Sequence, residues 1–150
     1  MRVVVQKVLE ASVKIDGKLH AEIEKGLLVF VGIEVADTQE DIHWLSNKIC
    51  SMRVFKDENQ VMNLSVKQVN GGILAVSQFT LQASTKKGNR PSYLKAASPE
   101  IALPMYEVFV AQLQKDLQAN VQTGVFGADM KISLVNDGPI TLCMDSKNRT

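Results

Sequence analysis

The sequence Gly72-Ile73-Leu74-Ala75-Val76 is followed directly by Ser77-Gln78-Phe79-Thr80-Leu81. The first five residues carry no charge and are rich in aliphatic side chains, which predicts a buried strand. The next residues place two hydroxyl groups, a carboxamide and an aromatic ring at the end of that strand. Such a group is either the ordinary polar end of a strand or part of a binding site, and spacing alone leaves both interpretations open.

A second dense stretch, Asn136-Asp137-Gly138-Pro139-Ile140-Thr141, lies between the apolar runs 130–135 and 140–144. Asn, Asp, Gly and Pro favour turns, so the pattern predicts a strand, a turn and a second strand. The trans preference of an X-Pro bond is only about 0.5–1 kcal/mol. A cis bond would point the Gly138 and Pro139 carbonyls the same way, whereas a trans hairpin turn is the commoner arrangement.

In this order, Ser77–Leu81 and Asn136–Thr141 resemble the two signature motifs of the D-aminoacyl-tRNA deacylases of the Gly-cisPro type. The flanking segments are similar to the same family, so the resemblance covers nearly the whole chain; they are residues 1–13, 26–32, 87–92, 97–100 and 122–135. The resemblance implies a rolled, barrel-like sheet with helices outside it. It also implies a homodimer in which the Gly-Pro turn of one subunit enters the pocket of the other.

The strand patterns agree with an α+β chain of mostly antiparallel strands and two helices. Asp16-Gly17 separates two alternating apolar runs and predicts a tight hairpin. The continuous apolar run 26–33 predicts a central strand. Shorter strands are predicted around residues 53–55 and 62–64.

The two helices have recognisable start signals. Asp37 and Thr38 are both suitable N-caps for the first, and Asp37 and Glu40 have the spacing of a capping box. Ser98-Pro99-Glu100 predicts the start of the second. Pro104 removes a hydrogen bond inside that helix, which predicts a kink or a restart at this residue.

The length, charge and residue composition of the chain limit the classes of function that it can have. A chain of 150 residues with 45% hydrophobic content suits one domain, residues 1–150. The net charge of +1 argues against a general nucleic-acid binder, so any such partner needs a local patch. No signal peptide or membrane span is apparent, so we expect a cytoplasmic protein. The two histidines and two cysteines form no cluster at ligand spacing, so we predict no metal and no cofactor.

The resemblance also assigns roles to residues. It implies that Ser77, Gln78, Phe79 and Thr80 are catalytic. It implies that the substrate is held and its chirality selected by Gly138, Pro139, Asn136, Lys7, Phe126 and Met130. The basic loop that contains Lys86, Lys87 and Arg90 is expected to contact tRNA phosphates, although a solvated loop is the simpler interpretation. At Lys7 the family commonly has Arg, so the contact that braces the Gly-Pro turn is in question.

The reaction implied is hydrolysis of the ester of D-aminoacyl-tRNA, with L-aminoacyl-tRNA rejected and glycyl-tRNA mischarged on tRNA-Ala accepted. A serine-hydrolase mechanism would need a histidine and a carboxylate beside Ser77 or Thr80. Neither His20 nor His43 lies near a motif that would orient it. We therefore favour backbone N–H groups around Gln78, Phe79 and Thr80 as an oxyanion hole, and the ribose 2′-OH of the substrate as an aid to water attack.

Two other classes remain open. The loop 86–95 could make the chain a non-catalytic nucleic-acid-binding module, which predicts steep salt dependence and no turnover. The chain could also hydrolyse free esters or small amides of D-amino acids and ignore the tRNA body.

Overall fold

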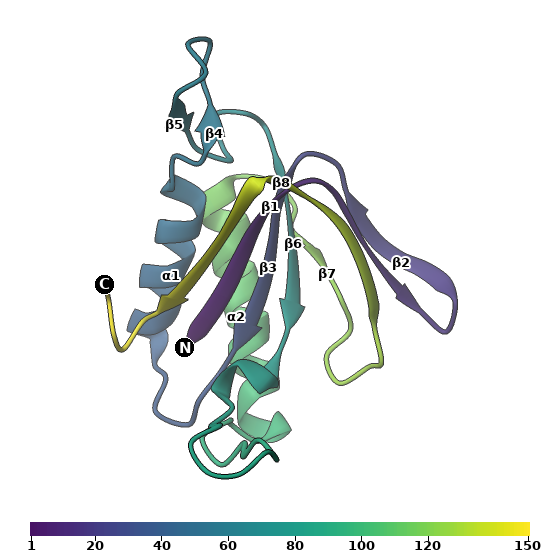
Figure 1. Cartoon of the computed structure of the whole chain (residues 1–150), viewed down its shortest axis with the longest axis vertical. Helices are drawn as coiled ribbons and strands as arrows, with labels where there is room; N and C mark the ends of the chain where they lie inside the picture. Colours follow the sequence, from purple (N-terminus) through teal and green to yellow (C-terminus); the bar gives the residue numbers. More distant parts are fainter.

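The structure is a computed structural model that describes the whole chain, Met1–Thr150. Its elements, in order, are β1 (Arg2–Ile15), β2 (Lys18–Ile23), β3 (Gly26–Gly32), α1 (Gln39–Ser51), β4 (Phe55–Lys56), β5 (Met62–Leu64), β6 (Gly72–Ser77), the 3-10 helix η1 (Phe79–Gln82), α2 (Pro99–Leu117), β7 (Gln122–Thr123) and β8 (Lys131–Asp145). Neither helix is both long and apolar enough to cross a membrane. Figure 1 shows the sheet with both helices on one side of it.

The main sheet has the strand order β2-β1-β3-β6-β7, and β8 pairs with β1. The three partners of β1 are all antiparallel to it, whereas β3–β6 and β6–β7 are parallel. The sheet is therefore mixed, and the predicted antiparallel character holds for the half that is centred on β1. The Asp16-Gly17 hairpin is confirmed, because both residues have positive φ angles, 50° and 75°, between β1 and β2.

β8 corrects the prediction of two strands joined by a hairpin. Both apolar runs pair with β1 in the same direction, because Asn136 faces Val8 and Thr141 faces Gln6. Four residues of β8 lie between these two pairs, but β1 has only Lys7 there. The turn formers therefore do not reverse the chain. They make the strand bulge outward, and the strand then continues along β1.

The sheet is buried on both faces. On one face α1 and α2 pack together over β1 and β3 and form the larger core. On the other face β2 and β8 curl over β3 and β6 and enclose a smaller core. Burial on both faces explains why β3 and β6 read as continuous apolar runs instead of alternating ones.

The start of α1 differs in detail from the prediction. Of the two possible N-caps, Thr38 is the one used, and its N–H donates to Asp41 Oδ2 at 2.7 Å. The capping box therefore joins Thr38 to Asp41, not Asp37 to Glu40. Asp37 instead accepts hydrogen bonds from the Met1 amino group and from a nearby backbone N–H, so it is not free to cap the helix.

The predicted restart of the second helix at Pro104 is wrong, because α2 runs without interruption from Pro99 to Leu117. Pro104 is the sixth residue of the helix, so only the hydrogen bond to the Glu100 carbonyl is lost. The first turn is fixed independently, since two backbone N–H groups donate to the Ser98 carbonyl. The alternative of a kink within a continuous helix stays a prediction.

Candidate functional site

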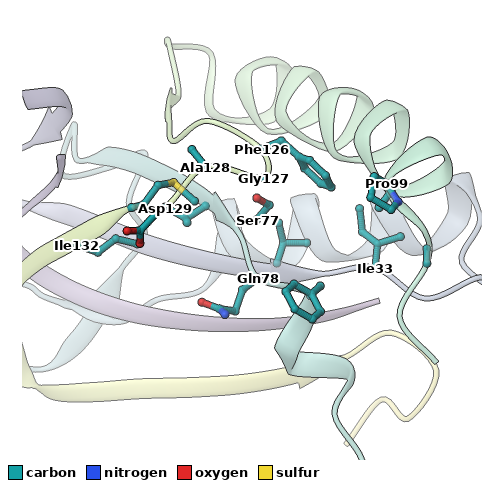
Figure 2. Close-up of a pocket in the computed structure, with 15 residues that line it drawn as sticks. Ile33, Ser77, Gln78, Pro99, Phe126, Gly127, Ala128, Asp129 and Ile132 are labelled. Atoms are coloured by element: carbon teal, nitrogen blue, oxygen red, sulfur yellow. The ribbon is translucent and has the colours of Figure 1, made fainter. Parts of the chain in front are cut away.

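A cavity of about 540 Å³ opens where β6 loses its neighbour. β7 pairs only with Leu74 and Ala75, so the edge of β6 is unpaired at Val76 and Ser77. The loop between β7 and β8 folds over this edge, and the start of α2 closes the far side (Figure 2). The lining is mostly apolar and consists of Val31, Ile33, Val76, Ser77, Gln78, Phe79, Ala97, Pro99, Ala102, Phe126, Gly127, Ala128, Asp129, Met130 and Ile132. The size and character are those of a small-molecule site.

Five of the sequence-predicted residues line this cavity: Ser77, Gln78, Phe79, Phe126 and Met130. In Figure 2 the Ser77 side chain and the Phe126 ring lie on either side of the same space. The 3-10 helix η1 that follows is held tightly on β3. A Cβ added to Gly32 would lie only 2.8 Å from the Leu81 side chain, and the buried Gln82 donates to the Gly32 carbonyl at 2.9 Å.

The hydrogen bonds around η1 show which of the predicted oxyanion-hole N–H groups are free to bind a substrate. The Gln78 N–H donates to the Val31 carbonyl at 2.7 Å, so including it in the oxyanion hole was wrong. The N–H groups of Phe79 and Thr80 have no acceptor within the chain, as is usual at the start of a short helix. Thr80 does not line the cavity, and its Oγ1 accepts a hydrogen bond from Gln78 Nε2 at 2.5 Å.

The wall formed by Phe126 is supported from below by Tyr106. The two ring centroids are 5.9 Å apart, and the Tyr106 hydroxyl donates to the Ala75 carbonyl at 2.9 Å. Burial raises the pKa of Tyr106 to about 12, so this group stays a neutral donor at physiological pH. The hydrogen bond thus fixes the strand from which Ser77 projects.

The Gly138–Pro139 bulge is rigidly held at its base. The Gly138–Pro139 peptide bond is cis. Asn136 Nδ2 donates to the Lys7 carbonyl at 3.0 Å and to the Ile140 carbonyl at 2.9 Å. Lys7 Nζ lies 2.7 Å from Asp137 Oδ2, and the Lys7 side chain is only 7% exposed. Lys7 therefore makes a contact with the turn.

Within one chain this bulge is remote from the cavity, and none of its residues lines it. Lys7 faces Leu27 of β3, which faces Ile73 of β6. Ser77 lies four residues further along β6, about 13 Å at 3.3 Å per residue. At the level of the bulge, two strands, β1 and β3, also lie between β8 and β6. Within a single chain, the Gly138–Pro139 bulge and the cavity beside Ser77 therefore lie apart.

The three basic residues assigned to tRNA, Lys86, Lys87 and Arg90, are all exposed in the loop that follows η1. The loop is closed by two hydrogen bonds between the backbones of Ser84 and Ser92, at 2.7 and 2.9 Å. None of the three basic side chains has an acidic partner within 4.0 Å.

No side-chain base stands beside Ser77. His20 and His43 are both exposed on other elements, β2 and α1. The one carboxylate of the lining, Asp129, lies at the rim with an exposed side chain and is paired with Lys131 at 2.8 Å. Likewise, no group of three histidine, cysteine or acidic side chains is arranged to hold a metal ion.

Sequence reasoning missed several lining residues. Ala97, Pro99 and Ala102 come from the start of α2, and Ile33 from the end of β3. They are small or apolar residues without a chemical signal, and only the packing of α2 beside β6 brings them to the cavity.

Comparison with known proteins identifies the family. A family model described as D-Tyr-tRNA(Tyr) deacylase matches residues 4–145. A D-aminoacyl-tRNA deacylase of Flavobacterium psychrophilum is 64% identical over 149 residues, 99% of each chain, and one of Parabacteroides distasonis is 62% identical over the same share.

Solved structures share the fold. One titled "c-Myc DNA Unwinding Element Binding Protein" has a TM-score of 0.92 and 39% identity, and covers 97% of this chain and 98% of that one. Another, titled as a probable eukaryotic D-amino acid tRNA deacylase, has a TM-score of 0.82 at 15% identity and covers 95% and 97% of the two chains. The family model and the full-length identities together show that this chain belongs to the D-Tyr-tRNA(Tyr) deacylase family, the D-aminoacyl-tRNA deacylases.

Proposed function

We propose that the chain hydrolyses the ester that joins a D-amino acid to the 3′-terminal adenosine of tRNA, and that it does so in the cavity beside Ser77. Family membership supports this carboxylic ester hydrolase activity. The observation that carries the choice of site is the pair of unpartnered N–H groups at Phe79 and Thr80, next to an apolar cavity large enough for an aminoacyl group. The products are free tRNA and the D-amino acid.

The two N–H groups stabilise the oxyanion that forms when water attacks the ester carbonyl. One donor of this kind contributes about 10²–10³ in kcat. The bond from water oxygen to the carbonyl carbon forms, and the bond to the ribose 3′-oxygen breaks. Because no side-chain base is at hand, the vicinal 2′-OH relays the proton of the water to the 3′-oxygen. Thr80 positions the substrate and forms no acyl-enzyme.

Two substrates and one variant test this mechanism. A D-aminoacyl-tRNA that ends in 2′-deoxyadenosine should be hydrolysed far more slowly than the normal substrate. The Thr80→Ala variant should keep measurable activity, because the backbone N–H remains. Trapping of an ester on the Thr80 hydroxyl, together with complete loss of activity in Thr80→Ala, would contradict the mechanism.

The chirality of the substrate is selected by exclusion. In this proposal the Gly138 and Pro139 carbonyls accept hydrogen bonds from the α-ammonium group, so that an L side chain points at backbone and a D side chain points into open space. Glycine has no side chain to exclude. Glycyl-tRNA, including glycine mischarged on tRNA-Ala, should therefore be hydrolysed together with D-aminoacyl-tRNA, and full resistance of glycyl-tRNA would contradict this geometry.

The site is completed by a second copy of the chain. The distance along the sheet between the Gly138–Pro139 bulge and Ser77 supports a homodimer in which the bulge of one subunit enters the cavity of the other. Within one subunit the bulge lies beside the start of β3 and β6, whereas Ser77 is at the end of β6, and Gly138 and Pro139 are exposed. In a two-fold symmetric dimer each subunit offers its bulge to the cavity of the other, so both sites are completed in the same way.

A mixture of two inactive variants tests the dimer. Gly138→Val damages the bulge, because a Cβ there would lie 2.8 Å from the Ile140 side chain at a φ of 125°. Ser77→Phe fills the cavity. If the site is shared, co-refolded mixtures should recover about a quarter of wild-type activity, since half of the dimers are mixed and each has one intact site. A mixture that stays inactive, with mixed dimers demonstrated by mass, would refute sharing.

A second candidate function has one observation in its favour. The 39% identical structure carries a title that names a DNA-binding protein, and this chain has an exposed basic loop with no acidic partners. A binding module would retain nucleic acid with a steep salt dependence and release no amino acid from D-aminoacyl-tRNA.

A further inference from the structure

Two aromatic rings stand exposed at the mouth of the cavity. Phe79 is 57% exposed and Tyr93 is 39% exposed, and their ring centroids are 5.1 Å apart at an interplanar angle of 70°. This edge-to-face arrangement fixes the two rings relative to each other and leaves ring surface open to solvent. Two neighbouring exposed aromatic rings beside a cavity are a candidate binding surface.

The pair joins the cavity to the basic loop. Phe79 lines the cavity, whereas Tyr93 does not. Tyr93 follows Ser92, where the loop closes onto Ser84, and its carbonyl accepts a hydrogen bond from the Ala96 N–H at 3.0 Å. The backbone at Tyr93 is therefore held by hydrogen bonds on both sides, and its ring continues the Phe79 surface beyond the residues that line the cavity.

The loop that carries Tyr93 has charges of one sign. Residues 86–95 contain four basic side chains and no acidic one, although the whole chain has a net charge of only +1; the four are Lys86, Lys87, Arg90 and Lys95. None of them is in an ion pair within the chain. Aromatic rings beside unpaired cations are the combination that binds single-stranded nucleic acid, because the rings stack on bases and the cations contact phosphates.

We propose that Tyr93, with Phe79, forms a stacking site for the base of the nucleotide that precedes the terminal adenosine of tRNA. The inference rests on the proposed function, which places the acylated adenosine at the cavity. Since Tyr93 lies outside the cavity and beyond Phe79, the base that it contacts belongs to the next nucleotide inward. The loop cations at Lys86 and Lys87 then face the phosphates of the single-stranded end.

The test compares three substrates of increasing length: D-tyrosyl-adenosine, the D-tyrosyl trinucleotide CpCpA, and D-tyrosyl-tRNA. Tyr93→Ala should lower kcat/KM about tenfold for the trinucleotide and the tRNA, the size of effect seen when a base-stacking aromatic residue is truncated. The lower kcat/KM should result from a higher KM. Hydrolysis of D-tyrosyl-adenosine should be unchanged. Tyr93→Phe keeps the ring and should match the wild type on all three.

Each other outcome overturns the inference. An equal loss on all three substrates would mean that Tyr93 supports the cavity or the terminal adenine, and no loss on any would mean that the ring makes no contact with the substrate. A loss in Tyr93→Phe equal to that in Tyr93→Ala would assign the effect to the hydroxyl. Failure of the proposed function is distinguishable, because the wild type itself would then leave all three substrates intact.

Discussion

Replacing Asn136 by alanine tests how the Gly138–Pro139 bulge is held. The Asn136 amide group donates two hydrogen bonds, to the Lys7 and Ile140 carbonyls at 3.0 and 2.9 Å, and both cross the base of the bulge. A neutral hydrogen bond contributes about 0.5–1.5 kcal/mol, so the loss of two should lower the free energy of unfolding by about 1–3 kcal/mol. Only Lys7 of β1 stands opposite the four bulged residues, and its ion pair with Asp137 is the other contact across the base of the bulge.

The matched variant is Asn136→Asp, which has almost the same shape but no N–H donor. A carboxylate would face two carbonyl oxygens, so this variant should be less stable than Asn136→Ala, although alanine removes more atoms. Denaturant unfolding measures the stabilities, and deacylation of D-tyrosyl-tRNA measures the function of the bulge, which both variants should impair. If Asn136→Asp is as stable as the wild type, the two hydrogen bonds do not support the bulge.

Three further predictions concern other parts of the chain. Burial raises the pKa of Asp41, but the hydrogen bonds that it accepts, chiefly from Lys147, lower the pKa by a larger amount, so the pKa lies below its usual value. The Asp41 carboxylate therefore stabilises the fold fully above the unfolded-state pKa of about 3.9, and this stabilisation is lost as the pH falls below that value. Asp41→Asn should accordingly lose less stability than the wild type between pH 5 and pH 3, and an equal loss would contradict the assignment. Burial raises the pKa of Cys50 to about 12, so Cys143→Ser should show no reactive thiol at pH 8 until it is unfolded, and rapid labelling of the native protein would contradict this. Gln82→Leu takes the donor away from the Gly32 carbonyl, which lowers stability, but it also removes the buried, unpaired Oε1, which raises it. Because the two effects oppose each other, the unfolding free energy should change by less than about 1 kcal/mol, and a larger loss would show that η1 depends on the bond to β3.

The sequence predicted the elements that depend on local chemistry. Asp16-Gly17 adopts the turn that its residue types favour, and the unbroken apolar runs became β3 and β6 because both faces of the sheet are covered. The polar residues after β6 border a cavity, and their role in a binding site stays a prediction.

The wrong details depend on partners that local pattern does not name. The turn formers near Gly138 gave a bulge instead of a hairpin because both halves of β8 pair with the same edge of β1. Asp37 was unavailable as a helix cap because it binds the amino group of Met1. The Gln78 N–H was unavailable as an oxyanion donor because the Val31 carbonyl accepts it. Each correction comes from a contact between residues far apart in the sequence.

The most direct measurement is the rate at which the purified protein deacylates D-tyrosyl-tRNA compared with L-tyrosyl-tRNA, with and without a chelator. We expect rapid loss of the D-ester alone, unchanged by the chelator, since in the proposed mechanism the two N–H groups of η1 and the substrate 2′-OH supply the chemistry. Retention of both esters would favour the binding module. Hydrolysis of both esters would contradict the central claim that the Gly138–Pro139 bulge excludes an L side chain.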